Sequence, residues 1–170
     1  MPQEEYWLSG PVPDIPVLAQ PAAHALLQTQ RELRAILLDF PKDKLWKKVG
    51  ERASVGFHAQ HLTGVLDRLL TYAQEKSLTK EQFLYLKLEG EANEKYSPEV
   101  LVENFEQKVT EALAYFKTLT EAHFTAPRFV GRKRLATNLL GLIFHAAEHS
   151  QRHLGQLLVT ASILIEKPEL

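Results

Sequence analysis

Three histidines near the end of the chain have the residue type and the spacing of a metal site. His145, His149 and His153 stand four residues apart in an apolar stretch whose periodicity predicts a helix. Residues four apart share one helix face and lie about 6 Å apart along the axis, so two neighbouring imidazoles can bind one ion. His145 and His153 are about 12 Å apart, too far to share it. The ligand pair is therefore His145 with His149 or His149 with His153.

Another ligand for the same ion must come from a second helix. The segment after Ser54 offers His58 and His61, which are three residues apart and share a face. Both are geometrically admissible from spacing alone. His24 and His123 are isolated, and no spacing argument supports them. The alternative to a metal site is a seam of hydrogen-bonded polar side chains inside a helical bundle.

The elements that must position these histidines are helices. Ser54, Ser97 and Thr137 have the side chain of an N-cap residue, and Thr79 with Gln82 has the form of a capping box. The periodicity predicts four long helices and one short helix, at 22–40, 54–75, 98–119, 138–166 and 79–88. Residues 120–136 are predicted to form a long loop. Because no convincing strand is present, the sequence predicts an all-α four-helix bundle.

The length of 170 residues predicts a single domain over 1–170. The first sixteen residues contain four prolines, which exclude a regular helix and predict an extended proline-rich N-terminal arm over 1–16. Tyr6 and Trp7 are expected to hold this arm against the body of the bundle.

Composition limits the classes of function. Hydrophobic residues make up 45% and charged residues 24%, as in an ordinary globular protein, and the formal net charge is −1. We therefore expect no nucleic-acid partner and no membrane partner. The chain has no cysteine, which excludes disulfides, thiolate ligands and a cysteine nucleophile. The amino terminus lacks the basic and apolar regions of a signal peptide, so a cytoplasmic location is expected.

Two segments of the chain resemble the signatures of a known family, the DinB/YfiT-like superfamily of four-helix-bundle proteins. The first segment is Ser54-Val-Gly-Phe-His-Ala-Gln-His61, in which a serine opens a helix and a histidine follows seven residues later. The second is His149-Ser-Gln-Arg-His153-Leu-Gly155-Gln156, which has the form His-x-x-x-His-x-Gly-Gln. The resemblance covers most of the chain. It selects His61 over His58, and it selects the pair His149 and His153.

The resemblance also implies a function. Members of the superfamily bind a divalent ion, often zinc or nickel, through three histidines, and many form homodimers. Some are thiol S-transferases or isomerases that use a low-molecular-weight thiol such as bacillithiol or mycothiol. It thus implies that His61, His149 and His153 hold an ion that activates a thiol or water nucleophile towards a small-molecule substrate. The alternative is a nonenzymatic bundle in which the ion has a structural role.

Other polar residues near these histidines have two interpretations each. His58 and His145 either line the pocket or belong to a polar seam. Glu148 lies about 100° around the helix from His149, so it is a general base only if the pocket extends that way. Gln156 either orients a ligand or packs in the bundle. The basic residues of 128–134 either bind a substrate carboxylate or phosphate or remain solvated. No catalytic residue is assigned.

Overall fold

Five α-helices and one β-hairpin make up residues 4–165, the part of the chain that this computed structural model describes. The elements are α1 (Gln20–Leu37), α2 (Val55–Ala73), α3 (Lys80–Leu88), α4 (Pro98–Lys117), β1 (Pro127–Val130), β2 (Leu135–Asn138) and α5 (Leu139–Ile165). None of the helices within the described range is long and apolar enough to cross a bilayer.

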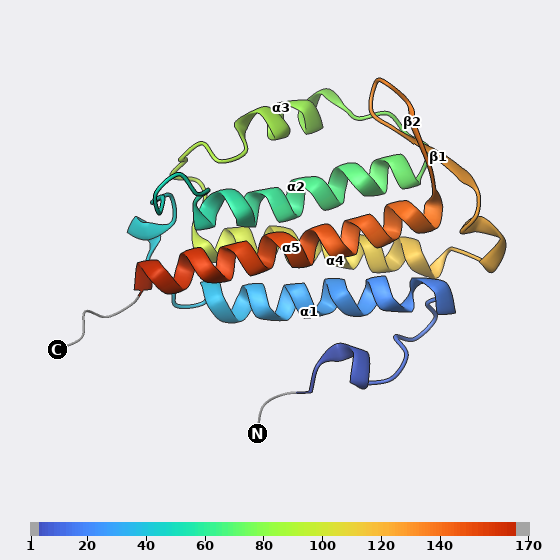
Figure 1. Ribbon diagram of the computed structural model, residues 1–170, viewed down its shortest axis with the longest axis horizontal. Coiled ribbons are helices and arrows are strands. Elements are labelled where there is room, and N and C mark those ends of the chain that lie inside the picture. The colour runs from blue at the N-terminus through green and yellow to red at the C-terminus, as the bar shows by residue number, and fades with distance from the viewer. Residues whose placement is uncertain (1–3, 166–170) are drawn as a thin grey trace.

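The four long helices pack as a bundle in which α1 and α2 each contact both α4 and α5 (Figure 1). Their apolar faces meet in one core. The largest fully buried side chains include Leu26, Leu33, Leu62, Leu66, Phe105, Phe116 and Ile143. The short helix α3 lies outside this bundle and packs on α2. The predicted all-α four-helix bundle is therefore confirmed.

Side-chain caps start the helices where the sequence predicts them, with one exception. The Ser54 hydroxyl accepts a hydrogen bond from the backbone N–H of Phe57 at 3.1 Å, and Thr79 forms the predicted capping box. The prediction that Thr137 caps the last helix is wrong, because Thr137 lies in β2. The neighbouring Asn138 accepts the hydrogen bond from the backbone N–H of Gly141, at 2.7 Å.

The segment predicted as a long loop contains a β-hairpin, so that prediction is wrong. Pro127–Val130 pairs in antiparallel register with Leu135–Asn138. The turn begins at Gly131, which has a φ of 68°, and closes with a hydrogen bond from the Arg134 N–H to the Gly131 carbonyl at 3.0 Å. Strands of four residues are too short for clear apolar alternation, which is why the sequence pattern did not reveal them.

The amino-terminal arm is held to α1 by one of the two predicted aromatic residues. The Tyr6 N–H donates to Gln28 at 3.2 Å, and the Arg31 guanidinium lies 4.8 Å from the Tyr6 ring centroid. Trp7 is 64% exposed, and within residues 4–165 its side chain hydrogen-bonds only to Glu5, so its predicted contact with the body is wrong. The arm also includes a 3-10 turn at Tyr6–Leu8. Residues 1–3 of the predicted arm and the predicted helix end at residue 166 lie outside the described range.

Candidate metal centre

Three histidines from two facing helices converge in the bundle. His61 of α2 and His149 and His153 of α5 each place one ring nitrogen within 4.8 Å of the others. The two Nε2 atoms of His61 and His149 are 3.0 Å apart, and the ring centroids of His61 and His153 are 4.3 Å apart. Of the alternatives that spacing leaves open, the structure brings together the pair His149 and His153 with His61.

Helix packing fixes where these rings lie. Leu62 and Leu66 of α2 and Leu154 and Leu157 of α5 are almost completely buried, so the two helices are held face to face. His149 and His153 are one turn apart on α5, which directs both rings towards α2. The cluster is therefore built on rigid elements, and its geometry does not depend on a loop.

The environment keeps His149 and His153 neutral. Burial, with a contribution from the nearby His61, lowers the pKa of His149 to about 4. Burial also lowers the pKa of His153 to about 3, with contributions from His61 and His149. A neutral imidazole has a free lone pair on one nitrogen, which is the state that binds a metal ion. At neutral pH these two rings are thus lone-pair donors.

A buried carboxylate fixes the orientation of the His61 ring. His61 Nδ1 lies 2.7 Å from Glu89 Oε2, and the other oxygen of Glu89 accepts a hydrogen bond from Arg68 at 2.6 Å. The Glu89 side chain is only 4% exposed. When Nδ1 of His61 carries the proton and donates a hydrogen bond to Glu89, Nε2 has no proton. The lone pair of Nε2 then faces the other histidines. This carboxylate–histidine arrangement is typical of metal sites.

Sequence reasoning missed Glu89 and Arg68, because no spacing rule connects them to the histidines. Glu89 ends α3, and the next residue, Gly90, has a φ of 87° and donates its N–H to the Gln60 side chain at 2.8 Å. At Gly64, a β-carbon would collide with the Glu89 carboxylate and the Arg68 guanidinium. An isolated glycine within the second predicted helix was the available signal of this close approach.

His58 contacts the cluster without being one of its three members. Its Nδ1 lies 3.0 Å from Nδ1 of His153, and burial lowers the pKa of His58 to about 4, with a contribution from His61. His58 thus occupies the same position relative to His153 as Glu89 does relative to His61. The ring of His149 has no comparable hydrogen-bond partner, because its Nδ1 is buried without a hydrogen bond among the described residues.

His145 and Glu148 form a separate pair beside the cluster. One ligand atom from each lies within 4.8 Å of the other and of His149. His145 Nδ1 is 2.7 Å from one Glu148 oxygen, and Arg152 donates to the other at 2.5 Å. Burial raises the pKa of Glu148, but the hydrogen bonds from His145 and Arg152 outweigh it, so the pKa lies below its ordinary value. A carboxylate held in this way is a weak base, which argues against the general-base role considered for Glu148.

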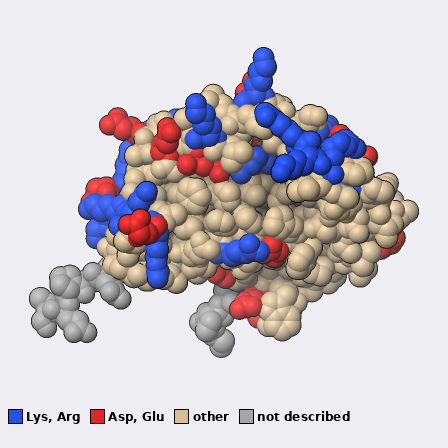
Figure 2. Space-filling model, turned by 45° about the horizontal axis from the view of Figure 1, so that its top comes forward, with Lys and Arg blue, Asp and Glu red and all other residues tan. Residues whose placement is uncertain are grey.

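The basic residues of 128–134 divide into two groups. Arg128 is buried, and its Nε donates to the backbone carbonyl of Ala73 at 2.7 Å, so it holds the hairpin against the end of α2. Arg132, Lys133 and Arg134 are exposed in the hairpin turn. Figure 2 shows Lys and Arg side chains gathered at the end of the bundle where the hairpin lies in Figure 1.

The donor set fits a divalent transition-metal ion. Three neutral nitrogens with no carboxylate or thiolate suit zinc or nickel. Two nitrogens bound to one tetrahedral zinc ion lie about 3.3 Å apart. The 3.0 Å between the Nε2 atoms of His61 and His149 differs from this by only a few tenths of an ångström. The residues present therefore match such an ion in chemistry, and the pair His61 and His149 also matches it in spacing.

The fold and the cluster define a class of protein, the four-helix bundles with three histidines on facing helices. The sequence profile of the DinB superfamily matches residues 25–157, which include all three histidines. The chain belongs to the DinB superfamily. No curated protein matches the sequence.

Solved structures share this fold at low sequence identity. A protein assigned to the DinB family from Exiguobacterium sibiricum has a TM-score of 0.69 and 18% identity, over 92% of this chain and 97% of that one. A conserved protein from Enterococcus faecalis has a TM-score of 0.67 and 15% identity, over 87% of this chain and 97% of that one. These similarities establish the fold.

A third structural neighbour corrects the expectation about partners. The colibactin self-resistance protein ClbS, crystallised in complex with double-stranded DNA, has a TM-score of 0.61 and 15% identity, over 88% of this chain and 96% of that one. The expectation of no nucleic-acid partner, which was drawn from composition, is therefore wrong. Net charge is a property of the whole chain, whereas DNA binding depends on local clusters of cations.

Proposed function

We propose that His61, His149 and His153 bind one divalent ion, zinc or nickel, and that this site activates a thiol or water nucleophile. The observation that carries the proposal is the set of three converging ring nitrogens with no fourth protein ligand among them. A divalent ion held by three neutral imidazoles keeps at least one coordination position open and lowers the pKa of a bound thiol or water.

The residues around the three histidines support this role. Glu89 is placed to accept a hydrogen bond from the Nδ1–H of His61, and His58 is placed to accept one from the Nδ1–H of His153. Both contacts leave Nε2 free on the ring concerned. Partners of this kind fix ring orientation and raise the basicity of the ligand. The low pKa values of His149 and His153 keep both rings neutral at neutral pH, so each ring has one nitrogen without a proton.

The resemblance to DinB/YfiT-like thiol S-transferases favours a thiol as the nucleophile, with a low-molecular-weight thiol such as bacillithiol as cosubstrate. At pH 7 a free thiol with a pKa of about 8.5 is only a few per cent thiolate. A thiol bound to a divalent cation is deprotonated outright. The gain from deprotonation alone is therefore about 30-fold at pH 7.

Turnover of a fluorogenic electrophile with bacillithiol tests this function. We expect the zinc-loaded protein to accelerate alkylation of the thiol at least about 30-fold over the metal-free protein at pH 7, for the reason just given. His153→Ala, assayed at the same zinc concentration, is expected to return the rate to background. Equal rates for the loaded protein and this variant across the thiols tried would instead support the alternative, a nonenzymatic bundle in which the ion fastens α2 to α5.

A second candidate function, binding of double-stranded DNA, is favoured by the hairpin turn. Its three consecutive cations, Arg132, Lys133 and Arg134, are all exposed. The structural neighbour ClbS was crystallised with double-stranded DNA. Guanidinium and ammonium groups on a protruding turn suit contact with backbone phosphates, which requires no sequence-specific readout.

Fluorescence anisotropy with a labelled duplex tests this candidate. Replacing the three turn cations with glutamine is expected to weaken binding and to lower the magnitude of the slope of log K against log salt concentration by about 3, since each phosphate contact contributes about 0.9. A matched control replaces three exposed lysines elsewhere, Lys42, Lys47 and Lys48. Equal losses for both triple variants, or no binding by the wild type, would rule out a DNA-binding role for this turn.

A further inference from the structure

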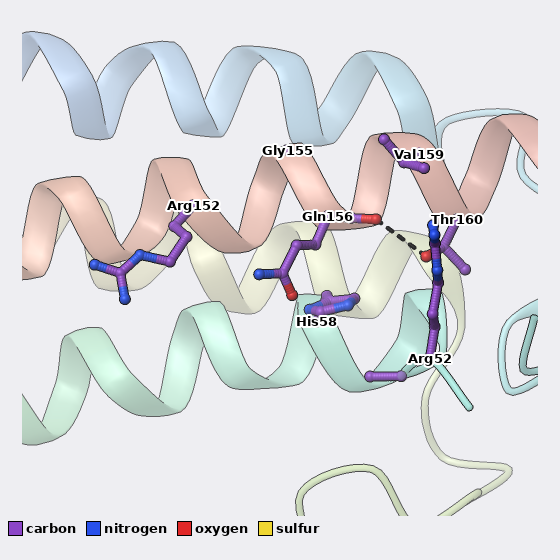
Figure 3. Close-up of a pocket in the computed structure, with 8 residues that line it drawn as sticks. Arg52, His58, Arg152, Gly155, Gln156, Val159 and Thr160 are labelled. Atoms are coloured by element: carbon purple, nitrogen blue, oxygen red, sulfur yellow. Dashed lines mark hydrogen bonds between the residues drawn. The ribbon is translucent and has the colours of Figure 1, made fainter. Parts of the chain in front are cut away.

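A cavity of about 460 Å³ opens between the start of α2 and the second half of α5 (Figure 3). Its volume lies within the usual range for small-molecule sites. His58 lines the cavity and is in contact with His153, so one imidazole separates the cavity from the histidine cluster. Figure 3 shows the Gln156 side chain reaching from α5 towards His58. A ligand in this cavity would thus reach the edge of the candidate metal centre.

The charged groups of the cavity are all cationic. Arg52 and Arg152 line it, and none of the residues that line it is acidic. In Figure 3 the two arginines stand at opposite ends. The Arg152 guanidinium is already paired with Glu148. None of the ion pairs among residues 4–165 includes Arg52, whose charge is therefore available to a ligand.

Gly155 keeps the wall of this cavity open. The residue lies in the interior of α5, where glycine is less favourable than alanine. Neither of the usual reasons for a glycine applies, because its φ is not positive and an added β-carbon would meet nothing within 4 Å. Any larger side chain would instead project into the cavity, next to the apolar surface of Ala53 and Val159. The glycine thus preserves space for a ligand.

We propose that this cavity binds the anionic group of a small molecule, a carboxylate or a phosphate, through Arg52. An apolar part of the same molecule would pack over Gly155 and Val159, and its reactive end would lie towards His58 and the cluster. The inference rests on the proposed function, because it takes the cavity as the site where the substrate lies next to the ion. It also replaces the sequence-based idea that residues 128–134 bind the substrate anion, since the hairpin does not line this cavity.

The test compares a charged probe with its neutral analogue on metal-free protein, so that no carboxylate can bind an ion. Benzoate and benzamide are titrated into ¹⁵N-labelled protein in a chloride buffer, and dissociation constants are taken from backbone chemical shifts. We expect benzoate to bind at least about tenfold more tightly than benzamide, because hydrogen bonds to a charged group are stronger. The largest shifts should fall on the cavity residues Arg52 and Gly155.

Substitutions test which residues produce the preference for benzoate over benzamide. Arg52→Gln should remove the preference for benzoate, and Gly155→Leu, which fills an open space on a helix surface, should weaken both probes. The matched control Lys87→Gln, which removes an exposed cation of α3 outside the cavity, should bind as the wild type does. Phenyl phosphate in place of benzoate distinguishes a phosphate ligand from a carboxylate ligand. Equal affinities for benzoate and benzamide, or a preference that survives Arg52→Gln, would overturn the inference.

Zinc content measured on the same samples separates this inference from the proposed function. If the protein binds zinc but does not prefer benzoate, only the anion site is wrong. If benzoate is preferred but no zinc is bound, the anion site stands and the metal-dependent function fails.

Discussion

Replacing His153 with alanine is expected to lower the affinity for Zn²⁺ by at least about 100-fold while leaving the bundle folded. The reason is that His153 supplies one of only three converging nitrogens. Loss of a residue that merely orients a metal ligand already costs 10–100-fold in affinity, in the order of magnitude seen across metal sites. Isothermal titration of metal-free protein with zinc measures the change, and circular dichroism checks that the variant remains helical.

Two other histidines serve as controls for this variant. His24→Ala removes an imidazole whose partner among the described residues is the Gly10 carbonyl, and the zinc affinity of this variant should match that of the wild type. His145→Ala tests the other pair that four-residue spacing allows. We expect it to retain zinc affinity, because His145 is paired with Glu148 and is not a member of the group with His61. A large loss for His145→Ala with little loss for His153→Ala would show that the ion uses the other pair.

Replacing Glu89 with alanine is expected to have two separate effects. The first is a 10–100-fold loss of zinc affinity, about what loss of a carboxylate partner of a ligand histidine costs. The second is a destabilisation of about 3–5 kcal/mol, because Arg68 would remain buried without its partner. Zinc titration measures the first effect. Chemical denaturation of the metal-free protein measures the second.

A double variant separates these two effects. In Arg68→Met/Glu89→Ala the unpaired buried cation is gone, so much of the stability should return. Zinc affinity should stay low, because His61 still lacks its carboxylate. Asp43→Ala is the matched control for stability, since it removes a carboxylate from an ion pair with Lys47 in which both side chains are exposed, and such pairs contribute little. A zinc affinity within twofold of the wild type in Glu89→Ala would show that Glu89 does not position His61.

The helices were predictable because their signals are local. Ser54, Thr79 and Ser97 cap helices where the sequence predicts them, and apolar periodicity marks the buried faces. The hairpin was not predictable, because its strands have four residues each and its turn depends on the backbone conformation at Gly131 and Arg134. Such features depend on contacts with α2 and α5 rather than on a pattern within the segment.

The histidine cluster was predictable only in part for the same reason. Four-residue spacing places His149 and His153 on one face but does not distinguish this pair from His145 and His149. The choice between them, and of His61 over His58, came from the resemblance to a family. Arg52 had no local signal, and Glu89 had none beyond the isolated Gly64 that it approaches, because each reaches its place through the packing of a loop against another helix. Residues that are distant in the sequence and complete a site can be identified only from the three-dimensional structure.

Metal content tests most directly whether His61, His149 and His153 hold a divalent ion. Native mass spectrometry after incubation with zinc or nickel and removal of excess ion gives the number of ions per chain. We expect one ion in the wild type and none in a variant with all three histidines replaced by alanine. A wild type that takes up no ion, or a triple variant that retains it, would contradict the claim.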